Sequence, residues 1–189
     1  MRTERERTTG RSGADALQAR VATALLAGVL IAAAAATTRA QTAEGQPDAE
    51  AAFARLAALA GQWEGTRSVD GNAASATYRL ASNGTVVMET LHRDTPNEMV
   101  SMYHIVGDEL VATHYCADGN QPRLVLTRAT AYTLEFDFAG GENIDVAVDG
   151  YIHAIRHRFG DDGVLESSWF WQGGHEGAHP NVLTLRRAQ

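Results

Sequence analysis

The hydrophobic pattern of the chain changes from helical to extended near residue 61. In residues 48–60, Phe53, Leu56 and Leu59 fall on one helical stripe, and Asp48 is a suitable N-cap. From Trp63 onward, short β-type runs alternate with turns rich in Gly, Asn and Asp. The pattern therefore predicts one short helix followed by a series of strands.

The spacing of the turns indicates consecutive hairpins. Such hairpins are typical of an all-β fold, and we expect a single antiparallel up-and-down β-barrel of about 8–10 strands with a short N-terminal helix. The barrel is predicted to span residues 51–189, after a polar spacer over residues 41–50.

The side chains predict the strand register of the hairpin around Asp161-Asp162-Gly163. A three-residue loop with Gly163 in the left-handed conformation pairs Gly160 with Val164. The facing pairs are then Phe159 with Leu165, Ile155 with Trp169, His153 with Trp171 and, outside, Arg158 with Glu166. A shift by one residue would place both tryptophans on the arginine face. The aromatic face is therefore predicted to line the inside of the barrel.

The hairpin around Gly107-Asp108 is predicted to have a two-residue turn. Both of its faces are apolar enough to be buried. We assign to the interior the face made of Ser101, Tyr103, Ile105, Leu110, Ala112, His114 and Cys116.

The N-terminal segment has the layout of a secretory signal. Residues 1–20 are polar and Arg-rich, residues 21–36 are apolar, and Thr38 and Ala40 are small residues at the two positions that a signal peptidase reads. The apolar run is short for a membrane span, which needs roughly 20 residues, although a single-pass anchor or a buried helix are the alternatives. We expect residues 1–40 to be a signal peptide cleaved near Ala40. The mature protein would then be periplasmic or secreted and have no stable membrane anchor.

Charge and cysteine content narrow the function classes. The chain has no lysine, and the part after residue 40 holds ten arginines and twenty acids, a formal charge of −10. Such a surface repels phosphate backbones, so nucleic-acid binding is not expected. Cys116 is the only cysteine, so the chain forms no internal disulfide.

Gly61-x-Trp63-x-Gly65, placed directly after the helix, resembles the entrance of a lipocalin-like (calycin-type) barrel. The resemblance implies that the helix closes one end and that an arginine of the last strand, Arg186 or Arg187, stacks over the tryptophan. A second run, residues 113–116 leading to residues 119–123, resembles a signature of exported bacterial proteins of unassigned function with this layout.

The same Gly-x-Trp-x-Gly is similar to that of haem-binding nitrobindin-like barrels. This resemblance implies a haem iron held by a histidine near the last strand, and His179 is the matching position. The glycines and Tyr-Pro that follow the motif in that family are absent after Gly65. We therefore expect a binding site without a cofactor, and a haem-binding site is the alternative.

The remaining motifs favour binding over catalysis. His175-Glu176-Gly177-Ala178-His179 has the spacing of a zinc protease, but Gly177 and Pro180 predict a surface loop instead of the required helix. His114 and Cys116 share a face, yet two ligands are short of a metal site. A Cys–His pair also needs an orienting group and an oxyanion donor, and the sequence offers neither. We therefore expect no metal, and a binding protein in preference to an enzyme.

The predicted function is the binding of a small, largely apolar molecule inside the barrel. The candidate ligand-binding residues are His153, Trp169, Trp171, Tyr103, His114 and Arg123. The pocket is expected to centre on His153 and the two tryptophans, not on the Cys116 loop. Arg123 would either clamp a ligand carboxylate or pair with an acid structurally. A filled structural barrel and a small-molecule isomerase or cyclase are the alternatives, and the oligomeric state stays open.

Overall fold

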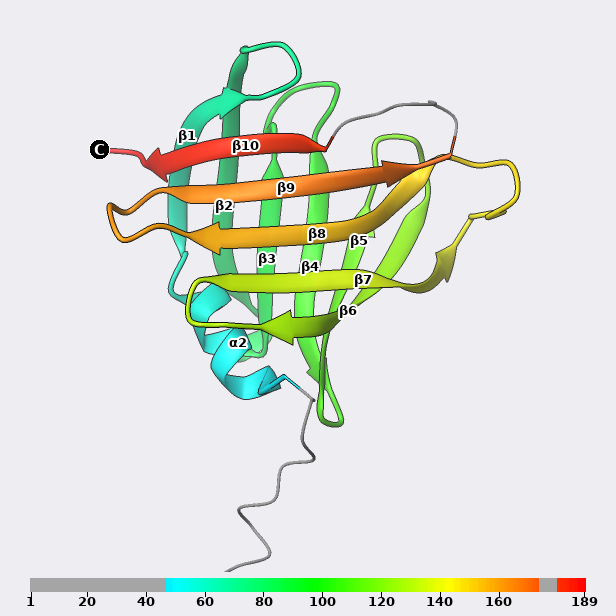
Figure 1. The fold of residues 1–189 in the computed structure, drawn as a ribbon, viewed down its shortest axis with the longest axis horizontal. Helices are drawn as coiled ribbons and strands as arrows, with labels where there is room; N and C mark the ends of the chain where they lie inside the picture. The colour runs from blue at the N-terminus through cyan, green and yellow to red at the C-terminus, as the bar shows by residue number, and fades with distance from the viewer. Residues whose placement is uncertain (1–46, 174–179) are drawn as a thin grey trace, which may run out of the picture. The chain divides into compact units, whose positions relative to one another are not determined.

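A computed structural model describes residues 47–173 and 180–189 of the chain. The expected signal peptide, His175 and His179 lie outside these residues. The described part has one α-helix, a single 3₁₀ turn (Ser82–Gly84) and ten strands (Figure 1). The bounds are α2 (Ala49–Ala57), β1 (Gly61–Arg67), β2 (Ala73–Ala81), β3 (Val86–Leu91), β4 (Met99–Val106), β5 (Glu109–Tyr115), β6 (Gln121–Ala129), β7 (Thr133–Glu142), β8 (Tyr151–Phe159), β9 (Leu165–Gln172) and β10 (Asn181–Arg187).

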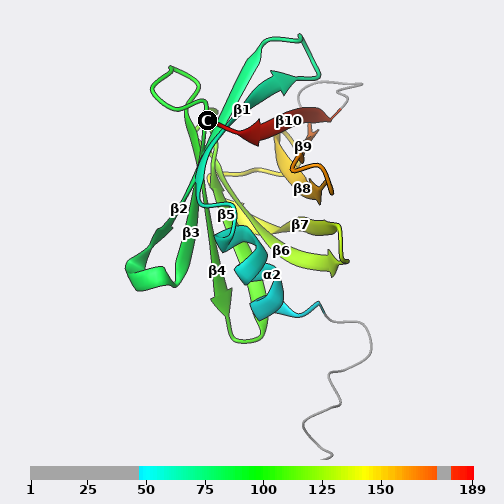
Figure 2. The same cartoon turned by 90° about the vertical axis from the view of Figure 1, so that its left-hand side faces the viewer.

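The ten strands form one closed antiparallel barrel. Each strand pairs with the next along the chain, and β1 pairs with β10 to close the ring (Figures 1 and 2). Within residues 47–173 and 180–189, closure therefore leaves no sheet edge free to pair with another chain. The predicted all-β up-and-down barrel with a short N-terminal helix is confirmed.

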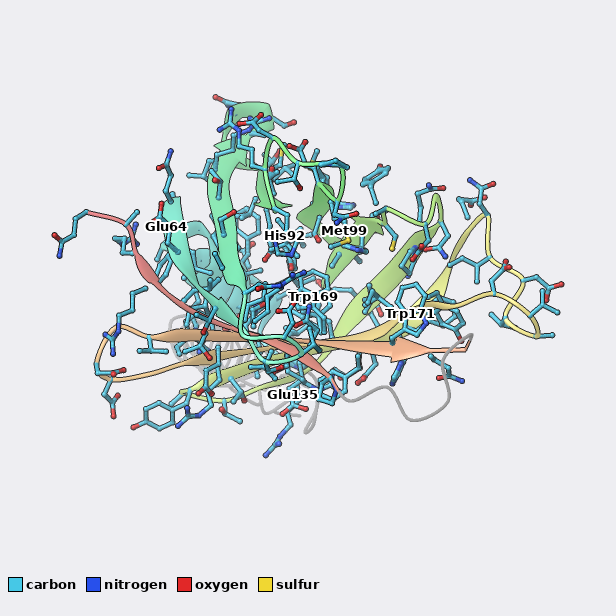
Figure 3. The ribbon with its side chains drawn as sticks, turned by 90° about the horizontal axis from the view of Figure 1, so that it is seen from above. Glu64, His92, Met99, Glu135, Trp169 and Trp171 are labelled. Atoms are coloured by element: carbon cyan, nitrogen blue, oxygen red, sulfur yellow. The ribbon has the colours of Figure 1, made fainter. Side chains whose placement is uncertain are left out.

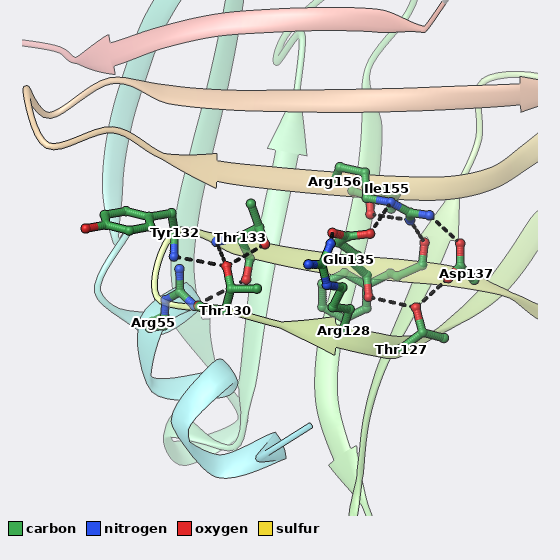
Figure 4. Close-up of polar contacts among 11 residues, drawn as sticks. Arg55, Thr127, Arg128, Thr130, Tyr132, Thr133, Glu135, Asp137, Ile155 and Arg156 are labelled. Carbon is green, nitrogen blue, oxygen red and sulfur yellow. Dashed lines mark hydrogen bonds and ion pairs between the residues drawn. The ribbon is translucent and has the colours of Figure 1, made fainter. Parts of the chain in front are cut away.

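The helix α2 packs at one end of the barrel (Figure 2). Its N-cap is Asp48, whose carboxylate accepts a hydrogen bond from the N–H of Ala51 at 3.0 Å. Leu56 is fully buried against the barrel core. The guanidinium of Arg55 donates to the carbonyl of Thr130 at 2.5 Å and so ties the helix to the β6–β7 turn (Figure 4). The helix begins inside the expected spacer and ends three residues before the predicted Ala60.

Trp63 anchors the start of the barrel. Its indole N–H donates to the carbonyl of Leu59 at 2.7 Å, and the guanidinium of Arg187 lies 4.8 Å from the ring centroid. Arg187 also donates to the carbonyls of Ala58 and Ala60, at 2.9 and 2.6 Å. These contacts join the last strand to the segment between α2 and β1, as the resemblance implied, with Arg187 as the stacking arginine.

Gly65 is required by the closure of the barrel. A Cβ atom at this position would lie 1.8 Å from the backbone carbonyl oxygen of Thr184 in β10. Only glycine permits the two strands to approach so closely. The final glycine of the Gly-x-Trp-x-Gly motif thus has a packing role at the β1–β10 seam.

The β4–β5 hairpin has the predicted register. Ser101 pairs with His114 and Tyr103 with Ala112, on either side of a two-residue turn. All four of these side chains are at most 1% exposed, which confirms the assignment of this face to the interior.

The turn end of the β8–β9 hairpin is also as predicted. Gly163 has a φ of +77°, and the N–H of Gly160 donates to the carbonyl of Val164 at 2.8 Å. Three of the expected pairs are present: Phe159 with Leu165, Ile155 with Trp169, and Arg158 with Glu166, the last joined by a 2.9 Å ion pair.

The predicted pairing of His153 with Trp171 is wrong. A register shift in β8 pairs Ile152 with Trp171 and Ala154 with Phe170, so His153 is the extra residue of a β-bulge. The apolar Ile152 takes the inner position, and the His153 ring lies 6.2 Å from that of Phe170. Because a bulge reverses the alternation of faces, the inner face inferred from the turn end does not extend to His153.

Candidate ligand-binding site

A cavity of about 200 Å³ lies at the end of the barrel opposite α2. The strands β3, β5 and β9 end here and β4, β8 and β10 begin here, whereas α2 packs where β4 ends and β5 begins. The described residues that line the cavity are Leu91, His92, Met99, His114, Cys116, Ala117, Asp118, Ile152, Trp169, Trp171, Asn181 and Leu183. Figure 3 looks onto this end, with His92, Met99, Trp169 and Trp171 labelled.

The two tryptophans give the cavity an apolar wall. The indole N–H of Trp169 donates to Ser167 Oγ at 2.9 Å, and that of Trp171 donates to the carbonyl of Gly173 at 2.8 Å. Both polar atoms are therefore engaged by the protein, and the rings offer carbon surface. Trp171 also packs against Gly150, where a Cβ would lie 2.4 Å from the indole ring.

His114 is the most deeply buried polar side chain on the cavity wall. Its ring centroid lies 4.9 Å from that of Trp169, and its Nδ1 is 2.9 Å from Ser101 Oγ. Within the described residues, its buried Nε2 has no hydrogen-bond partner. Burial lowers the pKa of His114 to about 4, so the imidazole is neutral near pH 7. An unpartnered buried nitrogen of this kind is the position at which a ligand atom or a water would be expected.

A buried polar network continues from His114 into the barrel. Glu89 is fully buried and accepts hydrogen bonds from the hydroxyls of Tyr78 at 2.6 Å and Tyr103 at 2.7 Å. Desolvation raises the pKa of the Glu89 carboxyl to about 7, while hydrogen bonds from Tyr78, Tyr103 and Ser101 oppose that rise. The Tyr103 hydroxyl also lies 3.1 Å from Nε2 of His157. This carboxylate is the feature that the sequence reasoning missed.

The alternation of β3 carried the missing signal. Val87, Glu89 and Leu91 share one face of the strand, and all three are buried. An acid between two apolar residues on an inward face predicts a buried carboxyl with hydrogen-bond partners.

The cavity includes the segment around Cys116, contrary to expectation. Cys116, Ala117 and Asp118 contribute to its lining, and the Cys116 thiol donates to the carboxylate of Asp118 at 3.6 Å. Burial raises the pKa of the Cys116 thiol. The thiol therefore stays protonated near pH 7 and is a poor nucleophile.

The structure brings together only part of the predicted residue set. Trp169, Trp171 and His114 line the cavity. Tyr103 is buried beside Glu89 and is not among the lining residues, and His153 lies outside with Phe170. This cavity is therefore not centred on His153.

Arg123 also lies away from the cavity. Its side chain is 39% exposed, and its guanidinium lies 3.8 Å from the carboxylate of Glu109. Of the two roles considered for Arg123, the structure supports pairing with an acid.

The outer face of β6, β7 and β8 carries a cluster of ion pairs that is separate from the cavity. Arg156 contacts the carboxylates of Asp137 at 2.6 Å and Glu135 at 3.1 Å, and Arg128 contacts Glu135 at 3.0 Å (Figure 4). Each of these charges has a partner on the sheet itself. The cluster is a solvated outer surface that stabilises this part of the barrel modestly.

The chain matches no known protein family and no curated protein. Within residues 47–173 and 180–189, no three His, Cys, Asp or Glu side chains are grouped so that they could hold a metal ion. The same residues include no helix that is long and apolar enough to cross a membrane. The closed ten-strand barrel is consistent with a calycin-like layout.

Proposed function

We propose that the protein is an exported binding protein of the lipocalin-like type, which holds a small, largely apolar molecule at the end of the barrel opposite α2. The observation that carries the proposal is the cavity between Trp169, Trp171 and His114. Apolar walls with a few polar groups are the usual composition of small-molecule sites. Export is proposed from the signal-like sequence of residues 1–40.

The cavity volume limits the size of the ligand. A dry cavity of roughly 150 Å³ holds benzene, whereas pockets for drug-sized ligands reach about 300–1,000 Å³. The 200 Å³ cavity therefore fits a molecule built on one substituted ring. Haem is a tetrapyrrole and much larger, so the volume favours the smaller ligand over the haem alternative.

The hydrophobic core of the barrel favours the filled-barrel alternative. There, Phe136, Leu124 and Tyr103 are completely buried and pack with Leu56 of α2 in one core. Side chains can fill a small barrel in this way. The proposed binding function is therefore restricted to the tryptophan end.

An isomerase or cyclase is the second candidate, because one observation favours it. The hydrogen-bonded chain from Glu89 through Ser101 to His114 links a carboxyl with a pKa of about 7 to the cavity wall. The group that borders the cavity, however, is an imidazole whose pKa is lowered to about 4, and such an imidazole is a weak base. Binding is therefore the preferred function.

Titration calorimetry with toluene tests the proposal. We expect saturable binding with a Kd on the order of 1 mM or tighter, the affinity that about 0.6 kcal/mol for each carbon atom gives. In Met99→Trp, the larger side chain should fill the cavity and weaken binding about tenfold or more, because the ligand loses its space. Leu80→Trp is the matched control, since Leu80 is 47% exposed and is not among the lining residues.

Two results would count against the binding function. One is the absence of saturable binding for toluene and also for phenol. The other is equal weakening by Met99→Trp and Leu80→Trp, which would place the bound molecule elsewhere.

A further inference from the structure

We infer that the ligand of this cavity carries a hydrogen-bond donor, an O–H or N–H group on a small apolar ring, which binds to Nε2 of His114. This inference rests on the proposed binding function and adds the chemical class of the ligand. It follows from the direction of the hydrogen bonds in the buried network behind the cavity.

The network begins at a group that only accepts hydrogen bonds when ionised. The two oxygens of Glu89 lie 2.6 Å from the hydroxyl of Tyr78 and 2.7 Å from the hydroxyl of Tyr103. Ser101 is the residue of β4 directly opposite Glu89 in β3, both side chains are fully buried, and a hydrogen bond from Ser101 lowers the pKa of this carboxyl. Because a carboxylate has no proton to give, all three hydroxyls must donate to it.

The hydroxyl of Ser101 has a single hydrogen, and the carboxylate takes it. The oxygen of Ser101 must therefore accept the 2.9 Å hydrogen bond that it shares with Nδ1 of His114. His114 is neutral, so a proton on Nδ1 leaves Nε2 without one. Nε2 is then an acceptor that has no partner among the described residues.

The same reasoning fixes the second buried histidine in the opposite tautomer. Tyr103 gives its hydrogen to Glu89, so its oxygen accepts from Nε2–H of His157 at 3.1 Å. His157 does not line the cavity. One carboxylate thus orients both of these imidazoles, and of the two it is His114 that presents its bare nitrogen at the cavity wall.

A second residue of the cavity wall points to the same ligand chemistry. Asn181 lines the cavity, and its buried Oδ1 has no hydrogen-bond partner in the part of the chain that the structure describes. A carbonyl oxygen only accepts hydrogen bonds. The two unpartnered buried atoms of the wall are therefore both acceptors, and a ligand that donates is the one that satisfies them.

Three probes of similar size test the inference at pH 8.5, where Glu89 is ionised: phenol, which donates; benzonitrile, which only accepts; and toluene, which does neither. Their Kd values are compared between the wild type and His114→Phe, which removes the acceptor and keeps a ring. We expect phenol to bind roughly threefold to tenfold more weakly to the variant, the effect of one buried hydrogen bond. The Kd values of toluene and benzonitrile should change less than twofold.

Three other outcomes have distinct meanings. If the substitution weakens the binding of benzonitrile and not that of phenol, His114 is a donor and the inference is overturned. If the substitution weakens the binding of none of the three probes, His114 does not contact the ligand. The inference then fails while the binding function stands. If none of the probes binds to the wild type, the proposed function itself fails.

A measurement without any substitution keeps the inference testable if His114→Phe does not fold. At pH 8.5, where Glu89 is ionised, the ¹⁵N chemical shifts of the His114 ring in the wild-type protein distinguish a protonated from a bare nitrogen. We expect a protonated Nδ1 and a bare Nε2. The reverse pattern would overturn the inference.

Discussion

Trp63→Ala is expected to lower the free energy of unfolding by about 3–5 kcal/mol, the usual cost of truncating a buried large aromatic side chain. Trp63 is 6% exposed and belongs to the barrel core. The substitution removes the ring beneath the guanidinium of Arg187 and the donor to the Leu59 carbonyl. Urea denaturation followed by circular dichroism measures the effect.

Two further variants separate the causes. Trp63→Phe keeps a ring and loses the N–H, so it should cost only about 1 kcal/mol beyond the loss of packing volume. Trp171→Ala is the control at the other end of the barrel, where the ring is only partly buried, and it should cost less than Trp63→Ala. A loss below about 1 kcal/mol for Trp63→Ala would show that Trp63 does not support the closure of the barrel.

The second large effect concerns the dependence of stability on pH through Glu89. Its pKa is about 7 in the folded protein, against 4.5 for an unperturbed carboxyl. At a pH between these two pKa values, the Glu89 carboxyl is protonated in the folded state and ionised in the unfolded state. Raising the pH through this range therefore destabilises the folded state. The shift in pKa corresponds to a contribution of roughly 3 kcal/mol to the free energy of unfolding. This contribution is present in full below pH 4.5 and is lost at pH values above about 7.

Glu89→Gln should remove this dependence. We expect the free energy of unfolding of the wild type, relative to that of Glu89→Gln, to fall by about 2–3 kcal/mol between pH 5 and pH 8. Urea denaturation of both proteins at the two pH values measures the difference. A difference that does not change with pH would mean that the Glu89 carboxyl ionises as it does in water.

The buried histidines act in the opposite direction, which is why the comparison with Glu89→Gln is needed. Burial lowers the pKa values of His114 and His157 to about 4. The unfolded chain therefore binds more protons between pH 4 and pH 6.5, and stability rises with pH over that window. Both proteins share this contribution, so it cancels in the difference.

The barrel could be predicted because its signals are local. Turn residues such as Gly163 and Gly107 fix the hairpin registers next to them, and alternation then identifies the inner face over the following residues. These hairpin features follow from residue type and spacing alone. The entrance motif, in contrast, is expected from the resemblance, and its Gly65 contacts β10, which is distant in the sequence.

The site was predicted less well, because it depends on contacts between distant strands. The bulge at His153 has no turn residue to announce it and reverses the faces beyond it. The buried carboxyl of Glu89 forms its hydrogen bonds with hydroxyls from two other strands, β2 and β4, and the local sequence does not show these contacts. Alternation placed Cys116 on the inner face, but only the structure shows that its segment borders the cavity.

A crystal structure of the protein soaked with bromobenzene tests the central claim most directly. The anomalous signal of bromine locates the bound molecule without any assumption about its pose. We predict a bromine peak inside the cavity, in contact with Trp169 and within reach of Met99 and Leu183. A cavity that stays closed to bromobenzene, with bromine found only on the outer surface or between α2 and the barrel, would contradict the account.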